Sequence, residues 1–161
     1  MRTQKKYKGI WFYGLSGSGK SYISKILNKK MKDSILVDGD NVRKLVSFDL
    51  GFDIKSREVQ IKRIYGICNL IISSKKFPIA SSVYFNQKIN NLCKKSGIIV
   101  IKIERNNFDK IINKHKTYKN NKDVVGKDIT YEKFKTEQII NNNRKYFMKK
   151  IDLFNRLNIK W

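Results

Sequence analysis

Short apolar runs alternate along the chain with longer stretches in which apolar residues recur every three or four positions. The runs are rich in β-branched and aromatic residues, which favours strands. They lie at residues 9–13, 34–37, 77–85 and 97–103. Because most positions within them are apolar, they are expected to be strands that are covered on both faces of a sheet.

The stretches between these runs have the spacing of amphipathic helices. Helices are expected at residues 20–32, 56–76, 86–95 and 133–157. The last of these places Ile140, Phe147, Ile151 and Phe154 on one stripe. The segment 116–130 is polar and contains glycine, asparagine and aspartate, so it is expected to be a loop.

Strands that alternate with helices predict βαβ units and a parallel sheet between two helical layers. The expected fold class is α/β, a three-layer αβα sandwich with a mainly parallel sheet. The 161 residues have the length of one domain, spanning 1–161. Ligands of such sheets bind beyond the carboxyl ends of the strands. The glycine-rich loop after the first run, residues 38–40 after the second and residues 81–84 at the end of the third are expected to meet there.

The chain carries a formal net charge of +23, from 36 Lys and Arg against 13 Asp and Glu. Such an excess is typical of proteins that bind nucleic acids or other polyanions. The lysines are spread along the whole length among many Asn and Ile residues, however, which indicates a solvated surface. Nucleic acid is therefore not the expected partner, although the charge should attract small polyanionic substrates.

Cys68 and Cys93, the two cysteines, lie in apolar helical stretches and are expected to be reduced core residues. The N-terminal apolar run is too short for a signal peptide, and no apolar stretch approaches the ~20 residues of a membrane span. No Cys and His residues have the spacing of a metal site. These features favour a cytoplasmic protein without a membrane segment.

The first apolar run leads into GLSGSGKS, which fits the pattern G-x-x-x-x-G-K-[ST] of a phosphate-binding loop. Glycines let the backbone curl so that several N–H groups face one anion, and the following helix adds its positive end. Lys20 is expected to bridge the β- and γ-phosphates of ATP, and Ser21 to ligate Mg²⁺ through its hydroxyl. The expected nucleotide-binding residues are Gly14, Leu15, Ser16, Gly17, Ser18, Gly19, Lys20 and Ser21.

Asp38 and Asp40 follow the second run and are separated by a glycine that lets the chain bend over a ligand. A carboxylate here could help hold Mg²⁺ through water or accept a proton from an attacking hydroxyl, and phosphoryl transfer needs both. Alternatively, Asp40 could be the N-cap of the next helix. Beside a phosphate-binding loop, a functional role is expected, and Asp40, Lys20 and Asp38 are the candidate catalytic residues.

Three blocks of the sequence together resemble the adenylylsulfate kinase family. They are GLSGSGKS, VDGDNVR and DLGFDIKSREVQIKRI, and they stand in the order and spacing of that family. A weaker match continues through ASSVYF and VVGKDITYE, so the resemblance spans most of residues 9–132. It implies transfer of the γ-phosphate of ATP to the 3′-hydroxyl of adenosine 5′-phosphosulfate.

The resemblance also implies roles for single residues. Asp40 resembles the catalytic base of the family and Asp38 its acidic neighbour. Arg43 and Arg57 resemble the ligands of the phosphosulfate group, and Phe52 resembles one face of the clamp around the acceptor base. The planar fork of arginine suits phosphate and sulfate oxygens, and an aromatic face stacks on a base.

The acceptor half of the sequence departs from the family pattern. Gln60 stands where the family usually has Asn. The family segment S-P-(Y/F)-R reads Ser82-Val83-Tyr84-Phe85 here, so that Phe85 replaces an anion-binding arginine. Gln60 and Ser82 are nevertheless expected to contact the acceptor.

The second half of the base clamp and the C-terminus depart as well. Val124 stands where the family has an aromatic residue, so a second ring would have to come from elsewhere, for example from Tyr118 or Tyr131. The C-terminal strand of the family is not visible in the sequence after residue 133. Changes of this kind are sufficient to alter which nucleotide is preferred.

The expected function is an ATP-dependent kinase of a 5′-modified nucleotide, with adenosine 5′-phosphosulfate as the first candidate. Two alternatives stay open, a related kinase of a nucleotide conjugate such as cytidine diphosphoramidate, and a nucleic-acid-binding P-loop protein. His115, the single histidine, is expected to be a surface residue and not a catalyst. Members of the family are commonly dimers, so the resemblance also points to a homodimer.

Overall fold

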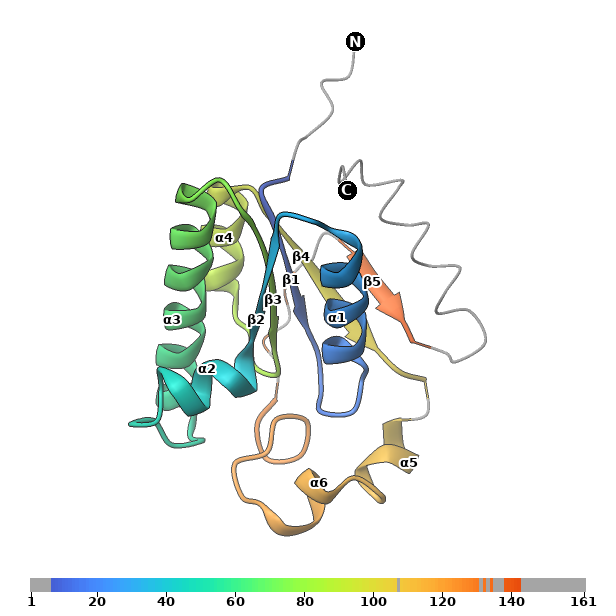
Figure 1. Cartoon of the computed structure of the whole chain (residues 1–161). Helices are drawn as coiled ribbons and strands as arrows, with labels where there is room; N and C mark the ends of the chain where they lie inside the picture. The colour runs from blue at the N-terminus through green and yellow to red at the C-terminus, as the bar shows by residue number, and fades with distance from the viewer. Residues whose placement is uncertain (1–6, 107, 131, 133, 135–137, 143–161) are drawn as a thin grey trace.

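Five parallel strands form one sheet at the centre of the computed structural model, which describes residues 7–106, 108–130, 132, 134 and 138–142 (Figure 1). The strand order is β2-β3-β1-β4-β5, and every registered pair runs parallel. The strands are β1 Gly9–Tyr13, β2 Ser34–Asp38, β3 Phe77–Ser82, β4 Ile98–Glu104 and β5 Gln138–Asn141. Their carboxyl ends therefore lie at one edge of the sheet.

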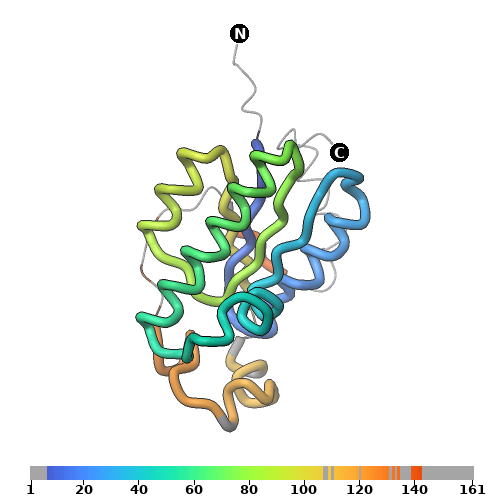
Figure 2. Tube along the Cα trace, turned by 60° about the vertical axis from the view of Figure 1, so that its left-hand side comes forward, coloured from blue at the N-terminus to red at the C-terminus, as the bar shows by residue number. Residues whose placement is uncertain are grey.

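Helices cover both faces of this sheet. They are α1 Lys20–Lys30, α2 Gly39–Leu45, α3 Ile54–Ser73, α4 Gln87–Ser96, α5 Phe108–Ile112 and α6 Lys116–Asn120. No helix within the described residues is long and apolar enough to cross a membrane. Helix α1 lies on one face of the sheet, and α3 and α4 lie together on the other (Figure 1 and Figure 2). This arrangement confirms the expected three-layer αβα sandwich.

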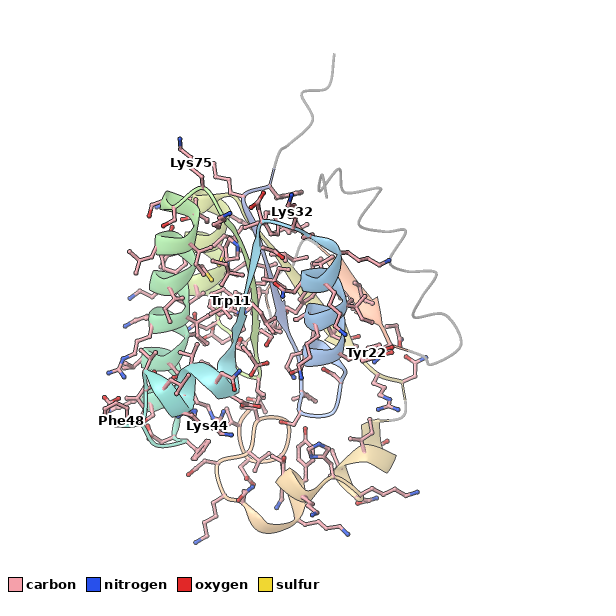
Figure 3. All side chains as sticks on the ribbon, in the orientation of Figure 1. Trp11, Tyr22, Lys32, Lys44, Phe48 and Lys75 are labelled. Atoms are coloured by element: carbon pink, nitrogen blue, oxygen red, sulfur yellow. The ribbon has the colours of Figure 1, made fainter. Side chains whose placement is uncertain are left out.

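Alternating side chains of the strands build two cores, one on each face of the sheet. Trp11, labelled in Figure 3, belongs to the core on the face of α3 and α4, together with Cys68 and Cys93. Its neighbour Phe12 points the other way and packs with Leu27 of α1. All five side chains are at most 1% exposed. The expected burial of both cysteines, which are free thiols, is thereby confirmed.

Side-chain caps fix where several helices begin. The carboxylate of Asp38 accepts hydrogen bonds from the N–H groups of Asp40 and Asn41 at the start of α2. Asn86 caps α4 in the same way, by accepting from the N–H of Ile89. The alternative in which Asp40 is the N-cap is wrong, because Asp40 already lies within the first turn of α2. Asp40 is therefore not needed as a cap.

The helix expected at residues 133–157 is wrong near its start, where β5 occupies Gln138–Asn141. This strand pairs with the end of β4, and Ile140 enters the core beside α1 with 1% exposure. Four residues are too few to show a period, so pairing with β4 decides their conformation. The C-terminal strand that the resemblance implied is therefore present. The remainder of the expected helix lies outside the described residues.

The segment expected to be a loop at 116–130 contains helix α6, which His115 caps by accepting from the N–H of Thr117. His115 itself is half-buried and not fully at the surface. Helix α5 precedes it and was not expected. Helices of five residues are stabilised by their tertiary contacts more than by an apolar period, and this explains why the sequence pattern missed both.

Candidate functional site

Polar residues at the carboxyl ends of β1, β2 and β3 surround a cavity of about 700 Å³. Its walls are formed by the phosphate-binding loop (residues 14–21), by α2, by the start of α3 and by the segment that carries α6. Both views show this last segment projecting beyond the carboxyl edge of the sheet (Figure 1 and Figure 2). Cavities of ~300–1,000 Å³ commonly hold small molecules, so a nucleotide can be accommodated.

The phosphate-binding loop joins β1 to α1 through glycines in left-handed backbone conformations. Gly17 has φ 83° and Gly19 has φ 100°, values that residues with a Cβ rarely adopt. Gly19 immediately precedes α1, so the loop ends at the N-terminus of an 11-residue helix. The positive end of the helix dipole and the adjacent N–H groups favour an anion at this place.

Lys20, the first residue of α1, is buried against the loop. Its Nζ donates to the carbonyl oxygen of Leu15 at 2.8 Å, and only 7% of the residue is exposed. Burial lowers the pKa of the Lys20 ammonium to about 8, and the nearby carboxylates of Asp40 and Asp38 oppose this shift. The ammonium group lies at the cavity wall and needs only to exchange a carbonyl oxygen for a phosphate oxygen.

Asp38, the last residue of β2, connects three elements through its two carboxylate oxygens. One oxygen accepts from the N–H groups at the start of α2. The other accepts from the hydroxyl of Ser21 in α1 at 3.2 Å and from the hydroxyl of Ser81 in β3 at 3.1 Å. The structure thus brings Asp38 and Ser21 together. It adds Ser81, whose hydrogen bond to Asp38 joins the neighbouring strands β2 and β3.

Asp40 lies in the first turn of α2, lines the same cavity and is exposed. Burial lowers the pKa of Lys20 and of the Arg43 guanidinium, and the Asp40 carboxylate opposes the shift in both. Asp40 therefore lies within electrostatic reach of a cation on each side. Asp40 is thus placed between the phosphate-binding loop, through Lys20, and the part of the wall that carries Arg43.

Arg43 and Arg57 both lie near the ring of Phe52 in the wall opposite the phosphate-binding loop. The guanidinium carbon of Arg43 is 4.7 Å from the centre of the ring and that of Arg57 is 5.7 Å from it. Arg57 also donates to the carbonyl oxygens of Phe52 at 2.7 Å and Asp123 at 2.8 Å. Phe52 remains 56% exposed and lines the cavity, so its ring can be reached from the cavity.

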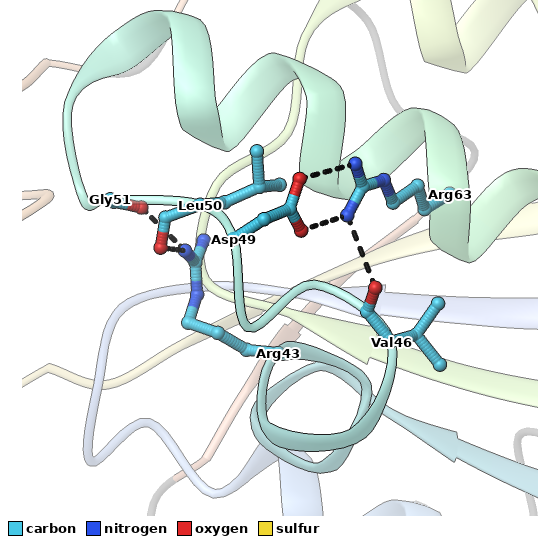
Figure 4. Close-up of polar contacts among 6 residues, drawn as sticks. All are labelled: Arg43, Val46, Asp49, Leu50, Gly51 and Arg63. Atoms are coloured by element: carbon cyan, nitrogen blue, oxygen red, sulfur yellow. Dashed lines mark hydrogen bonds and ion pairs between the residues drawn. The ribbon is translucent and has the colours of Figure 1, made fainter.

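Polar contacts hold the connection between α2 and α3 in place (Figure 4). Arg43 Nη1 donates to the carbonyl oxygen of Gly51 at 2.5 Å and to that of Leu50 at 3.4 Å. Arg63 forms a two-pronged ion pair with Asp49, with its shorter contact at 2.5 Å, and also donates to the carbonyl of Val46 at 3.1 Å. These contacts fix the loop that carries Phe52 beside the cavity.

Gln60 and Ser82, the other expected acceptor residues, differ in how they are placed. Gln60 is buried in the cavity wall, donates to the carbonyl of Gly39 at 3.0 Å, and has no partner for its Oε1 among the described residues. The hydroxyl of Ser82 instead accepts from Trp11 Nε1 at 2.9 Å and donates to the carbonyl of Tyr84 at 2.8 Å. The hydroxyl of Ser82 is thus engaged within the protein, and its backbone carbonyl also accepts from the N–H of Gly14 at 3.3 Å.

Phe85 and Val124, at two of the altered family positions, give the cavity neither an arginine nor a second ring. Phe85 is fully buried and contacts Trp11 and Tyr13, with ring centres 5.1 and 4.9 Å apart. Val124 lines the cavity with an aliphatic side chain. The suggestion that Tyr118 supplies the second ring is not supported, because its hydroxyl donates to Ser16 and its side chain is buried. Tyr131 lies outside the described residues.

Two residues that the sequence analysis missed also contact the phosphate-binding loop. Arg105, which follows β4, donates to the carbonyl of Gly17 at 3.2 Å. Asn142, which follows β5, donates to the carbonyl of Ser18 at 2.8 Å. No local signal could have found them, because the contacts span 88 and 124 residues of sequence.

The oxygen atoms of Ser21 and Asp38 fit a hard divalent cation. Mg²⁺ usually takes one or two protein oxygens together with phosphate oxygens and water, and these two oxygens are 3.2 Å apart at the edge of the loop. Within the described part of the chain, no group of three or more His, Cys, Asp or Glu residues could hold a metal by itself. A cation that arrives with a nucleotide suits this donor set best.

The sequence matches the family model described as adenylylsulphate kinase over residues 6–139. The adenylyl-sulfate kinase of Aeromonas salmonicida is 41% identical over 69 residues, which cover 40% of this chain and 35% of that protein. The adenylyl-sulfate kinase of Buchnera aphidicola is 41% identical over 85 residues, covering 49% and 40%. The aligned part thus spans well under half the length of these relatives.

Solved structures share the fold across nearly the whole chain. The Mycobacterium tuberculosis APS kinase CysC in complex with AMPPNP and APS superposes with a TM-score of 0.76 at 20% identity, covering 94% of this chain and 98% of that one. A sugar kinase from Janibacter superposes with a TM-score of 0.67 at 8% identity, covering 95% and 96%. Because kinases of different substrates share this fold, the side chains at the cavity must indicate the acceptor.

Proposed function

The chain belongs to the adenylylsulphate kinase family, and we propose that it transfers the γ-phosphate of ATP to the 3′-hydroxyl of adenosine 5′-phosphosulfate. One observation supports this most strongly. A single cavity is lined by the phosphate-binding loop with Lys20, by two arginines and an exposed ring, and by Asp40, whose carboxylate acts on both Lys20 and Arg43. A kinase needs a site for the phosphate donor, a site for the acceptor and a group that orients or deprotonates the attacking hydroxyl.

In this proposal the loop binds the triphosphate of ATP. The N–H groups of the loop and the N-terminus of α1 bind phosphate oxygens, and Lys20 leaves the carbonyl of Leu15 to contact the β- and γ-phosphates. Ser21 and Asp38 would hold Mg²⁺, which neutralises charge on the phosphates when it is bound. The link from Asp38 to Ser21 keeps these oxygens on the phosphate side of the cavity.

The acceptor would bind against Phe52, Arg43 and Arg57. The exposed ring of Phe52 can stack on the base, while the guanidinium groups exchange backbone carbonyls for phosphosulfate oxygens. This exchange is favourable because a charge-assisted bond to an anion is stronger than a bond to a neutral carbonyl. The free Oε1 of Gln60 can accept a hydrogen bond from the nucleoside.

The transfer step then needs one proton acceptor. The 3′-oxygen of the acceptor attacks the γ-phosphorus, the bond from that phosphorus to the β,γ-bridging oxygen breaks, and ADP leaves. Asp40 takes the proton of the hydroxyl as the new bond forms, and Lys20 stabilises the negative charge on the transferred group.

A coupled assay of ADP release tests the proposal. Adenosine 5′-phosphosulfate should stimulate ADP formation well above the ATPase background, and 3′-phosphoadenosine 5′-phosphosulfate should accumulate in equal amount. If millimolar acceptor gives no stimulation, adenosine 5′-phosphosulfate is not the substrate.

A second acceptor class is favoured by Phe85 and Val124. Phe85 is buried among aromatic side chains where the family has an anion-binding arginine, and Val124 gives the cavity no second ring. Another 5′-modified nucleotide, such as cytidine diphosphoramidate, fits these changes. Measuring kcat/KM for adenine and cytosine acceptors decides between the two classes. The value for the true acceptor should be at least tenfold higher than the value for the other.

The proposal places the enzyme in a reducing compartment, the cytoplasm. Burial raises the pKa of the Cys68 thiol to about 12, which makes it unreactive, and both cysteines are free.

A homodimer is a further expectation. Analytical ultracentrifugation of the purified protein measures the oligomeric state directly.

A further inference from the structure

Four consecutive carbonyl oxygens of the phosphate-binding loop each accept a hydrogen bond from a side chain. Lys20 donates to Leu15 at 2.8 Å and Tyr118 donates to Ser16 at 3.1 Å. As described above, Arg105 holds Gly17 and Asn142 holds Ser18. The last three donors come from α6, from the end of β4 and from the end of β5, so three separate segments converge on the outer side of one loop.

Holding a carbonyl oxygen also fixes the N–H group of the next residue. The peptide unit is planar and trans, so its C=O and N–H point in opposite directions. The bond to Ser16 therefore directs the N–H of Gly17, and the bond to Ser18 directs the N–H of Gly19. Within the described residues neither of these N–H groups donates to a protein acceptor, so both are available to an anion.

These two peptide units are also the ones that could most easily turn over. A peptide unit flips through ψ of the residue before it and φ of the residue after it, and a glycine after it removes most of the steric barrier. Gly17 and Gly19 are those residues, and both have positive φ. A loop that can invert these units without strain needs an external contact to keep one orientation.

We propose that Tyr118 and Asn142, with Arg105 between them, are positioning residues for ATP, which hold the peptide units of the phosphate-binding loop so that the N–H groups of Gly17 and Gly19 face the phosphates. They act through the loop and do not touch the nucleotide phosphates themselves. The inference rests on the proposed binding of ATP, and it is independent of the identity of the acceptor.

The surroundings of Tyr118 and Asn142 suit this role. Tyr118 is 3% exposed, and its ring lies edge-on to His115 with centres 5.9 Å apart. Burial raises the pKa of the Tyr118 phenol, so its hydroxyl stays protonated and remains a donor. The side-chain amide of Asn142 lies where a Cβ at residue 19 would be, which places it directly against the second of the two peptide units.

The variant Tyr118→Phe tests the contact by removing one hydroxyl and keeping the ring. Its dissociation constant for ATP, measured by calorimetry without acceptor, should rise on the order of fivefold, the usual effect of one lost hydrogen bond. The melting temperature and the KM for the acceptor should stay near wild type. Tyr65→Phe is the matched control, because its hydroxyl bonds Ser96 at 2.7 Å between α3 and α4, away from the cavity.

A second set of variants separates positioning from general stability. Asn142→Leu should weaken ATP binding to a similar extent. Arg105→Met should weaken it too, and Arg105→Lys, which keeps a donor, should restore most of the affinity. If the wild type binds ATP and Tyr118→Phe and Asn142→Leu bind it equally tightly, the inference is wrong. A wild type that binds no ATP would overturn the proposed function and this inference with it.

Discussion

Asp38 and Asp40 stand two residues apart and have very different surroundings. Both carboxylate oxygens of Asp38 accept hydrogen bonds, from donors in α1, α2 and β3. Asp40 is exposed at the cavity, in the first turn of α2. Four protein donors thus occupy the carboxylate of Asp38, whereas an incoming hydroxyl can reach the carboxylate of Asp40 from the cavity. In the proposed mechanism, Asp38 therefore positions its neighbours and Asp40 is the base.

Asp40→Asn should lower kcat by about 100-fold or more, because general base catalysis contributes ~10²–10⁴-fold. The dissociation constant for ATP should change little, since the loop is untouched. Steady-state kinetics and calorimetry measure the two quantities. Asp33→Asn is the control, because Asp33 pairs with Lys76 at the opposite edge of the sheet. Turnover near wild type in Asp40→Asn would show that another group takes the proton.

Lys20 should take up a proton when ATP binds. Burial lowers its pKa to about 8 in the free protein, and phosphate oxygens must raise that pKa again. At pH 8 about half of a proton should therefore be taken up per ATP bound, and at pH 6.5 almost none, since Lys20 is already charged there. Calorimetry in buffers of different ionisation enthalpy measures this uptake. The uptake should disappear in Lys20→Met, and equal uptake in both proteins would contradict the assignment.

At the scale of elements, strands and helices with a long or strongly apolar pattern were predicted correctly. β1, β2, β4, α1, α3 and α4 agree with expectation within three residues at each end. β3 ends at Ser82 and not at residue 85, because the aromatic residues that follow turn into the core. The short elements α5, α6 and β5 were not predicted from the sequence, because their conformation depends on what they pack against.

Two neighbouring substitutions test the strand assignment of β5. Ile140 is 1% exposed and Ile139 is 59% exposed, as expected for adjacent residues of a strand that point to opposite faces. Ile140→Ala should lower the free energy of unfolding by about 2–4 kcal/mol, as large-to-small core changes do. Ile139→Ala should cost less than about 1 kcal/mol. Chemical denaturation measures both, and equal losses would contradict this strand.

The whole molecule carries its charge of +23 as lysines and arginines spread along the chain. Of these residues, Lys20, Arg43, Arg57 and Lys122 line the cavity. A positive field over the whole surface should speed the encounter with polyanionic substrates without selecting among them.

Salt should therefore weaken substrate capture more than catalysis. Between ~0.05 and ~0.5 M salt, kcat/KM for ATP should fall severalfold while kcat changes little, because screening acts on the encounter. Binding to single-stranded oligonucleotides should be weak and should vanish near ~0.15 M salt. Tight oligonucleotide binding at that salt concentration would instead favour the nucleic-acid alternative.

The sequence by itself determined the phosphate-binding loop, the acidic turn, the layered α/β fold and the order of its main elements. Each of these depends on residues that are close in sequence, where spacing and glycine placement fix the local geometry. Only the tertiary structure decided that Phe85 belongs to the core, that Ser81 joins Asp38, and that Tyr118, Arg105 and Asn142 hold the loop. Those contacts join segments far apart along the chain, and packing of the complete sheet alone brings such segments together.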